Sequence, residues 1–326
     1  MAQISNVFTS YTAKGGREDL SNTIYNIDPF DTPLISSIGR RNVKNRIFDW
    51  QVESLPAVDG GNAKEEGFEL SRAAAQPTVR LSNTTQISSR DATVSGSQEA
   101  ADNAGRRSEM AHQMAIMSKA LKRDMETILC SNQARVAGSD ASTGTARKTR
   151  GLEHWIATNV SAGGTSYANA ASETAALTDG TTSVALDETK FNDLLQTCYE
   201  NGAEPKVALV RPVIKRKISS FTGRTGSQIA VSKVEAVNTV DIYRSDFGDV
   251  KIVPSRWLRK RTISSKEVSA VFLLDPEYAA VAYYRPFQTV DIATIGDAET
   301  KMILAEYGLE MRNEKAHGKM PDIAAS

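Results

Sequence analysis

One long helical stripe constrains the fold of this chain more than any other feature. Between Ser108 and Val136 apolar side chains recur every three or four residues, which is the period of one α-helical face. They are Met110, Met114, Met117, Leu121, Met125 and Ile128. Ser108 suits the N-cap, and Gly138 follows the last expected turn. Such a helix would be roughly 40 Å long at 1.5 Å per residue, so the remaining elements must pack around it.

The opposite face of this helix is charged and is predicted to be solvated or to meet another polar surface. Its side chains are Lys119, Lys122, Arg123 and Glu126. Lys122 and Glu126 are one turn apart, a spacing that favours an ion pair. A helix with a single narrow apolar stripe is expected to act as a strut.

Length and charge limit the class of protein. A chain of 326 residues exceeds what one simple core usually holds, which indicates two lobes or one lobe with large extensions. With 39 basic and 39 acidic residues, no net charge attracts nucleic acid or a membrane. Cys130 and Cys198 lack metal-ligand spacing and are predicted to pack in a reducing compartment. No apolar run approaches the roughly 20 residues of a membrane span, so we expect a cytosolic protein.

The N-terminal region, residues 1–45, is predicted to be an extended arm. It offers a short helix over 17–27 and a second one that begins at Thr32-Pro33, with Thr as cap and Pro at the first position. Its apolar side chains have no partner nearby in the sequence, and we expect a neighbouring subunit to cover them. They are Ile24, Tyr25, Phe30, Leu34, Ile35 and Ile38.

Residues 46–96 are predicted to form a projecting β-hairpin. Phe48, Trp50 and Val52 alternate with polar residues, and a second extended run covers 78–96. The stretch 56–76 between them is rich in Gly, Ala and acidic residues, and a loop of this length usually has a task. Because a lone two-stranded ribbon is only marginally stable in water, we expect it to lie on another molecule.

The second half of the chain is predicted to contain a compact α/β lobe. A short apolar anchor at 151–156 is followed by 157–183, whose small polar residues indicate a flexible surface loop. A helix from Asp187 to Gly202, a central strand over 207–210 and a helix opened by Pro212 come next. Strands are then predicted around a Gly248-Asp249 turn, over 268–274 and 278–287, and over 301–312, the last lying beside the long helix.

Residues that could carry chemistry are few. His112 is predicted to be packed or at the surface, and His317 to be solvated in a polar tail. His154 lies next to Trp155, but no Gly-x-Ser-x-Gly turn and no ligand cluster accompanies it. The glycine pairs lack the lysine and spacing of a phosphate-binding loop. We therefore predict no catalytic, cofactor-binding or metal-binding residue and no enzyme activity.

Three basic clusters were weighed as binding sites. Such runs are usually solvated, and otherwise contact phosphate or acidic groups of a neighbouring subunit. The clusters are Arg40, Arg41, Lys44 and Arg46; Arg147, Lys148 and Arg150; and Arg256, Arg259, Lys260 and Arg261.

One covalent reaction was also weighed. Lys64 at the hairpin tip could attack Asn313 of a neighbour, with Glu314 as proton acceptor, to form an isopeptide link. An ordinary exposed lysine in a charged loop is the preferred interpretation, and a covalent ladder on a denaturing gel would contradict it.

The order of these parts resembles the major capsid proteins of tailed bacteriophages, the Hong Kong 97-type fold. Short motifs that follow one another from residue 17 to residue 288 carry the resemblance. They are Arg17-Glu18-Asp19-Leu20-Ser21, Asp31-Thr32-Pro33, Glu109-Met110-Ala111, Leu121-Lys122-Arg123-Asp124-Met125-Glu126, Gly151-Leu152-Glu153, Asp241-Ile242-Tyr243, Asp246-Phe247-Gly248, Leu274-Asp275-Pro276-Glu277-Tyr278 and Arg285-Pro286-Phe287-Gln288.

The resemblance implies an α+β chain divided into an N-terminal arm, 1–45; an extended β-hairpin loop, 46–96; a spine helix of the peripheral domain, 97–138; an axial domain, 139–290, with some peripheral-domain strands near its end; and a C-terminal peripheral-domain strand and tail, 291–326. It implies a structural protein that assembles as hexamers and pentamers into an icosahedral head around double-stranded DNA. The arm begins within the first twenty residues, so no fused scaffold domain is expected.

The implied partners are copies of the chain, packaged DNA held non-specifically, and, as candidates, separate scaffold, portal and decoration proteins; no membrane is expected. The protein would reside in the virion after assembly in the host cytoplasm. Net neutrality suits a container wall, because an interior that gripped DNA strongly would hinder packing and ejection.

Two alternatives remain open at this point. The first is an encapsulin-like compartment, which has the same fold but encloses enzymes. The second is a cytosolic hydrolase that uses His154.

Overall fold

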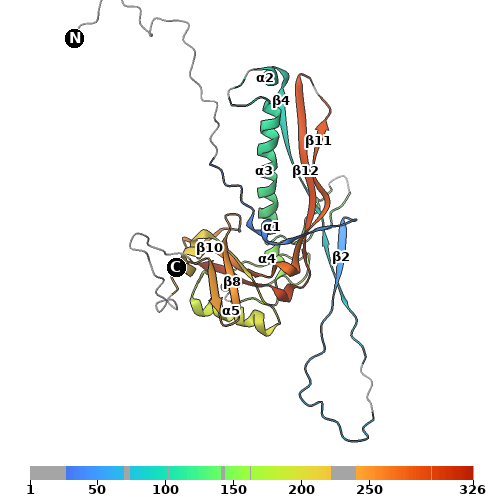
Figure 1. Cartoon of the computed structure of the whole chain (residues 1–326), viewed down its shortest axis with the longest axis vertical. Coiled ribbons are helices and arrows are strands. Elements are labelled where there is room, and N and C mark those ends of the chain that lie inside the picture. The colour runs from blue at the N-terminus through green and yellow to red at the C-terminus, as the bar shows by residue number, and fades with distance from the viewer. Residues whose placement is uncertain are drawn as a thin grey trace, which may run out of the picture.

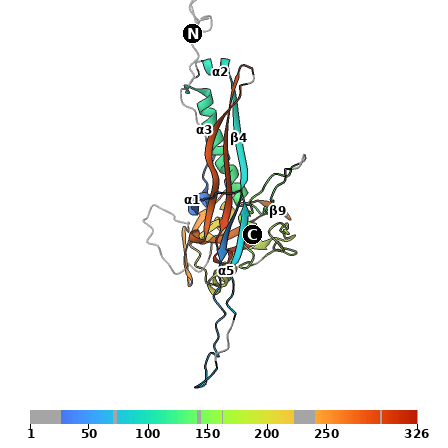
Figure 2. The ribbon, with the colours of Figure 1, turned by 90° about the vertical axis from the view of Figure 1, so that its right-hand side faces the viewer.

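The computed structural model describes residues 27–69, 74–101, 103, 105–140, 144–161, 163–221, 240–294 and 296–325. The molecule is elongated, with the helix α3 (Glu109–Leu129) and long strands at one end and a thin β-ribbon that projects from the other (Figure 1). A view turned by 90° shows the helix lying against the long strands, so that the two form separate layers (Figure 2). The helix predicted for 17–27 falls outside the described residues except for Ile27.

The predicted strut is α3, which spans Glu109–Leu129. The side chain of Ser108 accepts a hydrogen bond from the backbone N–H of Ala111, so the predicted N-cap is confirmed. The helix ends at Leu129 rather than near Val136, because the backbone beyond Cys130 bonds elsewhere: Val136 pairs with Lys148 in an isolated bridge. A separate short helix, α2 (Gly96–Ala100), precedes it, so 97–138 is not one helix.

A four-stranded sheet lies against α3. Its order is β1 (Gly39–Asn42), β11 (Ala279–Ile292), β12 (Ala298–Met311) and β4 (Gln86–Ser95); β1 is parallel to β11, and the other pairs are antiparallel. Leu121, Met125 and Leu129 of α3 share one buried core with Ile303 and Tyr307 of β12. The predicted return of a late strand beside the long helix is confirmed. β1, by contrast, lies within the stretch predicted to be an arm.

The ribbon consists of β2 (Ile47–Val52), β3 (Val79–Thr84) and the loop between them. The two strands pair in antiparallel fashion, with Ile47 opposite Thr84. At Thr85 the chain leaves the ribbon and enters β4, so the predicted hairpin over 46–96 is in fact a ribbon followed by a strand of the larger sheet. Phe48 is buried against Gly308 of β12, where a Cβ would lie 2.7 Å from the ring, so the base of the ribbon packs on its own chain.

A second sheet forms the compact lobe at the lower end of α3. Its path runs β5 (Val184–Ala185), β13 (Gly318–Ala324), β10 (Lys266–Leu274), β6 (Val207–Val210), β8 (Gly248–Pro254) and β7 (Ile242–Ser245), and β9 (Arg261–Ile263) pairs with β10. The helices α5 (Glu188–Glu200) and α6 (Pro212–Ser219) begin and end close to the predicted residues. The central position predicted for β6 is confirmed, because it lies between β10 and β8.

Packing in this lobe follows the sequence pattern. α5 contributes Phe191, Leu194, Leu195 and Cys198 to a second buried core, which also includes Val271 of β10. The predicted turn at Asp275 is the short 3-10 helix η2 (Pro276–Tyr278), in which the carboxylate of Asp275 accepts a hydrogen bond from the N–H of Glu277. Cys130 and Cys198 are both buried and unbridged, as predicted.

The C-terminal residues are not a polar tail, and this prediction was wrong. After the short 3-10 helix η3 (Glu314–Ala316), β13 inserts between β5 and β10 and so is a strand of the second sheet. His317 and Lys319 are consequently buried. Both find polar partners: His317 Nδ1 accepts from the N–H of Asp275, and Lys319 Nζ donates to the carbonyl of Glu153.

The segment after α4 (Leu152–Trp155) also departs from the sequence prediction. The anchor itself is confirmed, because all four α4 residues are buried. The described residues of 157–183 are tied down by bridges between Val160 and Lys319 and between Ala168 and Thr178, although their side chains are small. A segment poor in large side chains is therefore held by backbone and polar contacts instead of an apolar core.

Candidate assembly surfaces

The short helix α1 (Pro33–Ser37) is anchored to α3 by a buried carboxylate. The predicted start at Thr32-Pro33 is confirmed, but Thr32 makes no side-chain cap. The Glu126 carboxylate instead accepts hydrogen bonds from the N–H groups of Leu34 (2.6 Å) and Ile35 (3.0 Å). Glu126 is 0% exposed, so its placement on a solvated face with Lys122 was wrong. Burial raises the pKa of Glu126 to about 7, against the lowering effect of the two N–H groups.

Anchoring α1 also buries apolar side chains that were expected to need a neighbour. Leu34, Ile35 and Ile38 enter the core formed by α3 and the four-stranded sheet of the same chain. Phe30 remains 61% exposed and Ile27 nearly fully exposed. The expectation therefore fails for Leu34, Ile35 and Ile38, because α1 is bonded to Glu126 of α3, about ninety residues away along the same chain. Ile24 and Tyr25 are outside the described residues.

The ribbon tip is the most exposed apolar feature of the described chain. Leu55 is 92% exposed and Val58 100%, and Phe68 is half exposed. Acidic residues surround them: Glu53, Asp59, Glu65, Glu66 and Glu69, with Lys64 as the one basic residue in 53–69. Figure 1 shows this loop extending away from the body of the molecule. Apolar side chains held in water on a projecting segment mark a surface for another molecule.

A buried glutamate fixes the base of the ribbon. Glu306 of β12 is 1% exposed, and its carboxylate accepts from Arg147 Nη2 (2.6 Å), Thr85 Oγ1 (2.7 Å) and Arg285 Nε (2.9 Å). Thr85 is the residue at which the chain passes from β3 to β4. Glu306 thus joins the ribbon, the four-stranded sheet and the segment after α3 at one point.

The basic clusters are largely used inside the chain, which neither sequence interpretation anticipated. Arg259 donates to Glu153 (3.0 and 2.8 Å) and to Asp179 (2.7 and 2.5 Å). Arg261 pairs with Asp322, whose carboxylate also accepts from the N–H of Gly180. These bonds connect α4, β9 and β13 with the 157–183 segment.

In the other two basic clusters, which begin at Arg40 and at Arg147, some residues also interact within the chain and others stay exposed. Arg41 pairs with Glu310 at 2.8 Å, and Arg147 pairs with Glu306. Arg150 stacks over the ring of Trp155, 4.0 Å from its centroid, and burial lowers the pKa of Arg150 to about 10. Arg40 and Lys44 stay exposed.

The histidine geometry does not provide a general base. His154 is buried; its Nδ1 accepts from Arg150 Nε at 2.7 Å, so Nε2 carries the proton and donates to the carbonyl of Ala175 at 2.7 Å. Burial lowers the pKa of His154, which keeps the ring neutral. Burial likewise lowers the pKa of His317 to about 4. His112 lies half-buried on α3, in agreement with its prediction.

The groups considered for a cross-link have other roles in the subunit. The Asn313 side chain accepts from the N–H of Lys315, and Glu314 accepts from the N–H groups of Ala157 and Thr158 at 3.0 and 3.1 Å. Lys64 is exposed. An isopeptide link therefore stays an unfavoured prediction. Among the described residues, no group of three or more His, Cys, Asp or Glu is placed to hold a metal ion, and no described helix combines the length and apolarity needed to cross a membrane.

The fold and these surfaces can be compared with known proteins. The family model described as SU10 major capsid protein matches residues 3–324, nearly the whole chain. The chain belongs to the SU10 major capsid protein family. A curated relative, the major capsid protein of Escherichia phage Phieco32, is 29% identical over 344 aligned positions, which cover 96% of each chain. This SU10-family protein is therefore a structural component of a capsid shell built from copies of itself, and it is part of the virion.

Solved structures show the same fold at low sequence identity. The cyanophage A-1(L) capsid subunit superposes with a TM-score of 0.67 at 12% identity, covering 98% of this chain and 100% of that one. The capsid of a native GTA particle gives 0.64 at 12% identity, over 97% and 98% of the two chains. The SrpI encapsulin of Synechococcus elongatus gives 0.55 at 10%, over 95% and 93%. The expected Hong Kong 97-type α+β fold is confirmed.

Two structurally central residues of the SU10-family protein escaped the sequence analysis. Glu126 and Glu306 were hidden because a charged residue on a helix or an alternating strand predicts a solvated side. One weak signal existed for Glu306: its strand runs through apolar residues on both sides of it, from Ile303 to Leu309.

Proposed function

We propose that this SU10-family capsid protein assembles through hexamers and pentamers into an icosahedral phage head that encloses double-stranded DNA. The observation that carries the proposal, beside family membership, is the ribbon tip. Leu55, Val58 and Phe68 are exposed in the isolated subunit, and a neighbouring copy repeated by symmetry would cover the tip of every subunit in a shell. Assembly takes place in the host cytoplasm, with separate scaffold, portal and decoration proteins as candidate partners.

The division of labour follows from the architecture. We assign α3 and the four-stranded sheet to the peripheral part of each capsomer, and the lobe built on the second sheet to the axial part. The ribbon, β2 to β3, is the extended loop. This assignment differs from the sequence-based ranges at two strands. We assign β4 to the peripheral sheet instead of the extended loop, and β13 to the axial lobe instead of the C-terminal tail. The protein's role is structural and non-enzymatic.

A tip variant tests assembly. Replacing Leu55, Val58 and Phe68 together by Ser removes the exposed apolar groups and leaves the core of the subunit intact. We expect electron microscopy to show shells for the wild-type chain and none for this variant, while both unfold at the same temperature. A control that changes Asn62 to Ser and Gln76 to Asn alters the same loop and should still form shells. Equal shell formation by the tip variant would reject the ribbon contact.

An encapsulin-like compartment that encloses enzymes is the second candidate function, because the SrpI encapsulin shares the fold. The contents of the shell separate the two. Nuclease-resistant double-stranded DNA in shells from infected cells supports the phage head, whereas an enclosed enzyme without DNA supports a compartment. The hydrolase alternative loses its candidate base, because both ring nitrogens of His154 are engaged.

A further inference from the structure

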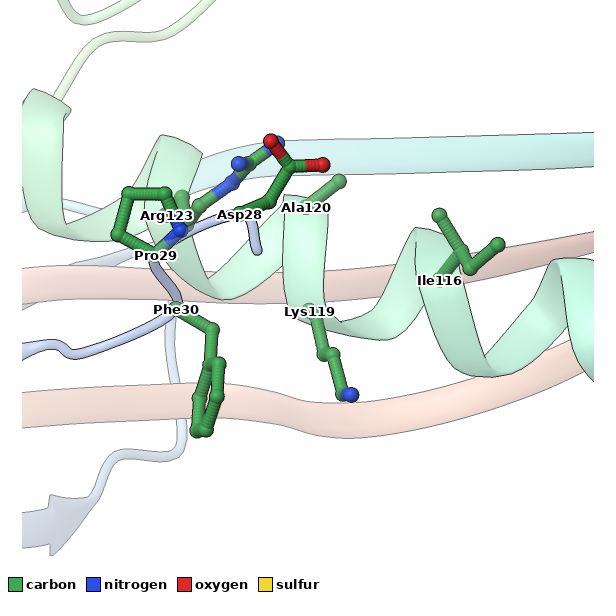
Figure 3. A pocket seen from close by; sticks show the side chains of 7 residues that line it. All are labelled: Asp28, Pro29, Phe30, Ile116, Lys119, Ala120 and Arg123. Atoms are coloured by element: carbon green, nitrogen blue, oxygen red, sulfur yellow. The ribbon is translucent and has the colours of Figure 1, made fainter. Parts of the chain in front are cut away.

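Three cations on one face of α3 lack carboxylate partners. Lys122 and Arg123 lie three and four residues after Lys119, so both adjoin Lys119 on the surface of the helix. Each lies over an aromatic ring: Lys119 over Phe30 (5.2 Å to the centroid), Lys122 over Phe287 (5.9 Å) and Arg123 over Trp257 (5.6 Å). No described carboxylate forms an ion pair with any of the three. Figure 3 shows Lys119 extending beside the Phe30 ring.

These cations belong to a longer basic strip. Three hollows of about 110, 410 and 500 Å³ follow one another along residues 28–42, where this segment lies between α3, α6 and β11. Their charged lining consists of seven basic residues and two acidic ones, Asp28 and Asp31. We define the basic strip as Arg40, Lys119, Lys122, Arg123, Lys215, Arg216 and Arg256.

Most of the strip is available to an outside anion. Arg256 pairs with Asp31 and Lys215 with Asp241, but the remaining five form no ion pair within the described chain. A ring face attracts a cation without accepting its N–H bonds in the way a carboxylate does, so the stacked side chains are positioned yet keep donors for a ligand. The balance of 39 basic and 39 acidic residues conceals this local excess.

We propose that the basic strip binds backbone phosphates of double-stranded DNA. The hollows are open and follow one another, which suits a ligand with repeated anions more than one with a single deeply bound group. Phosphate contacts of this kind are independent of sequence and weaken with salt, so packing and ejection need not be hindered. The inference rests on the proposed function only for the presence of DNA inside the shell.

The acidic ribbon tip of a second copy is the competing anion. Its described residues 53–69 carry five acidic groups and one lysine, a net charge of −4. The tip also presents Leu55, Val58 and Phe68, which need apolar walls. In the strip a cation lies over one face of each of Phe30, Phe287 and Trp257, so charge interrupts the apolar surface there even though Phe30 stays 61% exposed. The chemistry of the strip therefore matches phosphate better than it matches the tip.

The test measures binding of a fluorescein-labelled 40-base-pair duplex to the unassembled full chain by fluorescence anisotropy at several salt concentrations. The strip variant is Lys119→Gln, Lys122→Gln and Arg123→Gln. The control, Lys44→Gln, Lys64→Gln and Lys266→Gln, removes the same charge at exposed sites that form no ion pair within the described part of the chain. Losing three phosphate contacts should reduce the slope of log K against log salt by about 2.7, which is a salt effect about 40-fold smaller between 50 and 200 mM.

A reduced slope in the strip variant, with wild-type behaviour in the control and unchanged unfolding temperatures, supports the proposal. If the triple variant does not fold, Lys119→Gln and Lys122→Gln tested singly should each reduce the slope by about 0.9. Equal slopes in strip variant and control, or no duplex binding by the wild-type chain, overturn it. So does a strip variant that binds DNA normally but forms no shells, if the charge-reversed strip Lys119→Glu and Lys122→Glu regains shells when Glu65 and Glu66 are changed to Lys, because the ligand is then the tip. Shell formation, scored separately, tests the proposed function.

Discussion

Glu126 makes the stability of the subunit depend on pH in a predictable direction. In the folded chain its pKa is about 7, against an ordinary value near 4.5. Because the folded-state pKa is the higher one, the folded state binds the proton more tightly. The stabilisation is fully present below about pH 4.5 and is lost as the pH rises through 7. The difference amounts to about 3 kcal/mol, most of it between pH 5 and pH 8.

The perturbation is Glu126→Gln, which keeps the size of the side chain and removes its titration. A protonated carboxyl and an amide each offer one carbonyl acceptor to the N–H groups of Leu34 and Ile35, so wild type and variant should have similar free energies of unfolding at acidic pH, where wild-type Glu126 is protonated. Urea unfolding of unassembled subunits at pH 5, 6, 7 and 8 gives the free energy of unfolding. The free energy of unfolding of the wild type should fall by about 2–3 kcal/mol relative to that of the variant as the pH rises from 5 to 8.

The comparison isolates Glu126 because every other titrating group, including the buried His154 and His317, is the same in both proteins. Glu66→Gln, in the exposed tip, serves as the matched control and should run parallel to wild type. Parallel curves for Glu126→Gln as well would refute the reasoning, since they would mean that α1 docks without placing a titrating carboxylate in its core.

Three further predictions concern packing, charge and backbone conformation. Gly308→Ala brings a Cβ within 2.7 Å of the Phe48 ring and should lower the free energy of unfolding by about 1–3 kcal/mol in urea titrations, and shell yield with it. Glu306→Gln leaves Arg147 beside a neutral partner, and a loss of about 3–5 kcal/mol is expected; a loss below 1 kcal/mol would show that the carboxylate is dispensable. Ser265 has a φ of +66°, which glycine adopts without strain, so Ser265→Gly should raise the free energy of unfolding by about 0.5 kcal/mol. A lower melting temperature in the variant would contradict this prediction.

Local periodicity was sufficient for elements that pack through regular apolar patterns. The stripe of α3, the buried strand at 207–210 and the helix of Phe191 each repeat with the period of their structure. The strand and the helix of Phe191 were predicted close to their observed bounds, and α3 was predicted correctly at its start but too long at its end. The short motifs between residues 17 and 288 then indicated a resemblance to the major capsid proteins of tailed bacteriophages. These signals are local, because a helix or strand shows its buried face within a few consecutive residues.

The missed features depend on contacts between residues far apart in the sequence. Glu126 looks like a surface residue until α1 places two N–H groups against it. Lys319 and His317 look like parts of a tail until β13 enters a sheet whose other strands lie elsewhere in the chain. The local sequence around a buried polar residue does not show that it is buried, because its burial depends on a hydrogen-bonding partner elsewhere in the chain.

The passage of the chain through Thr85 has a mechanical consequence. Only this residue separates the ribbon from a strand of the sheet that packs on α3, and its hydroxyl is bonded to a buried carboxylate. The ribbon thus has no pliable joint at its root and behaves as a lever arm continuous with the sheet. A load on the tip is therefore passed into the sheet that packs on α3 and is not taken up at a hinge.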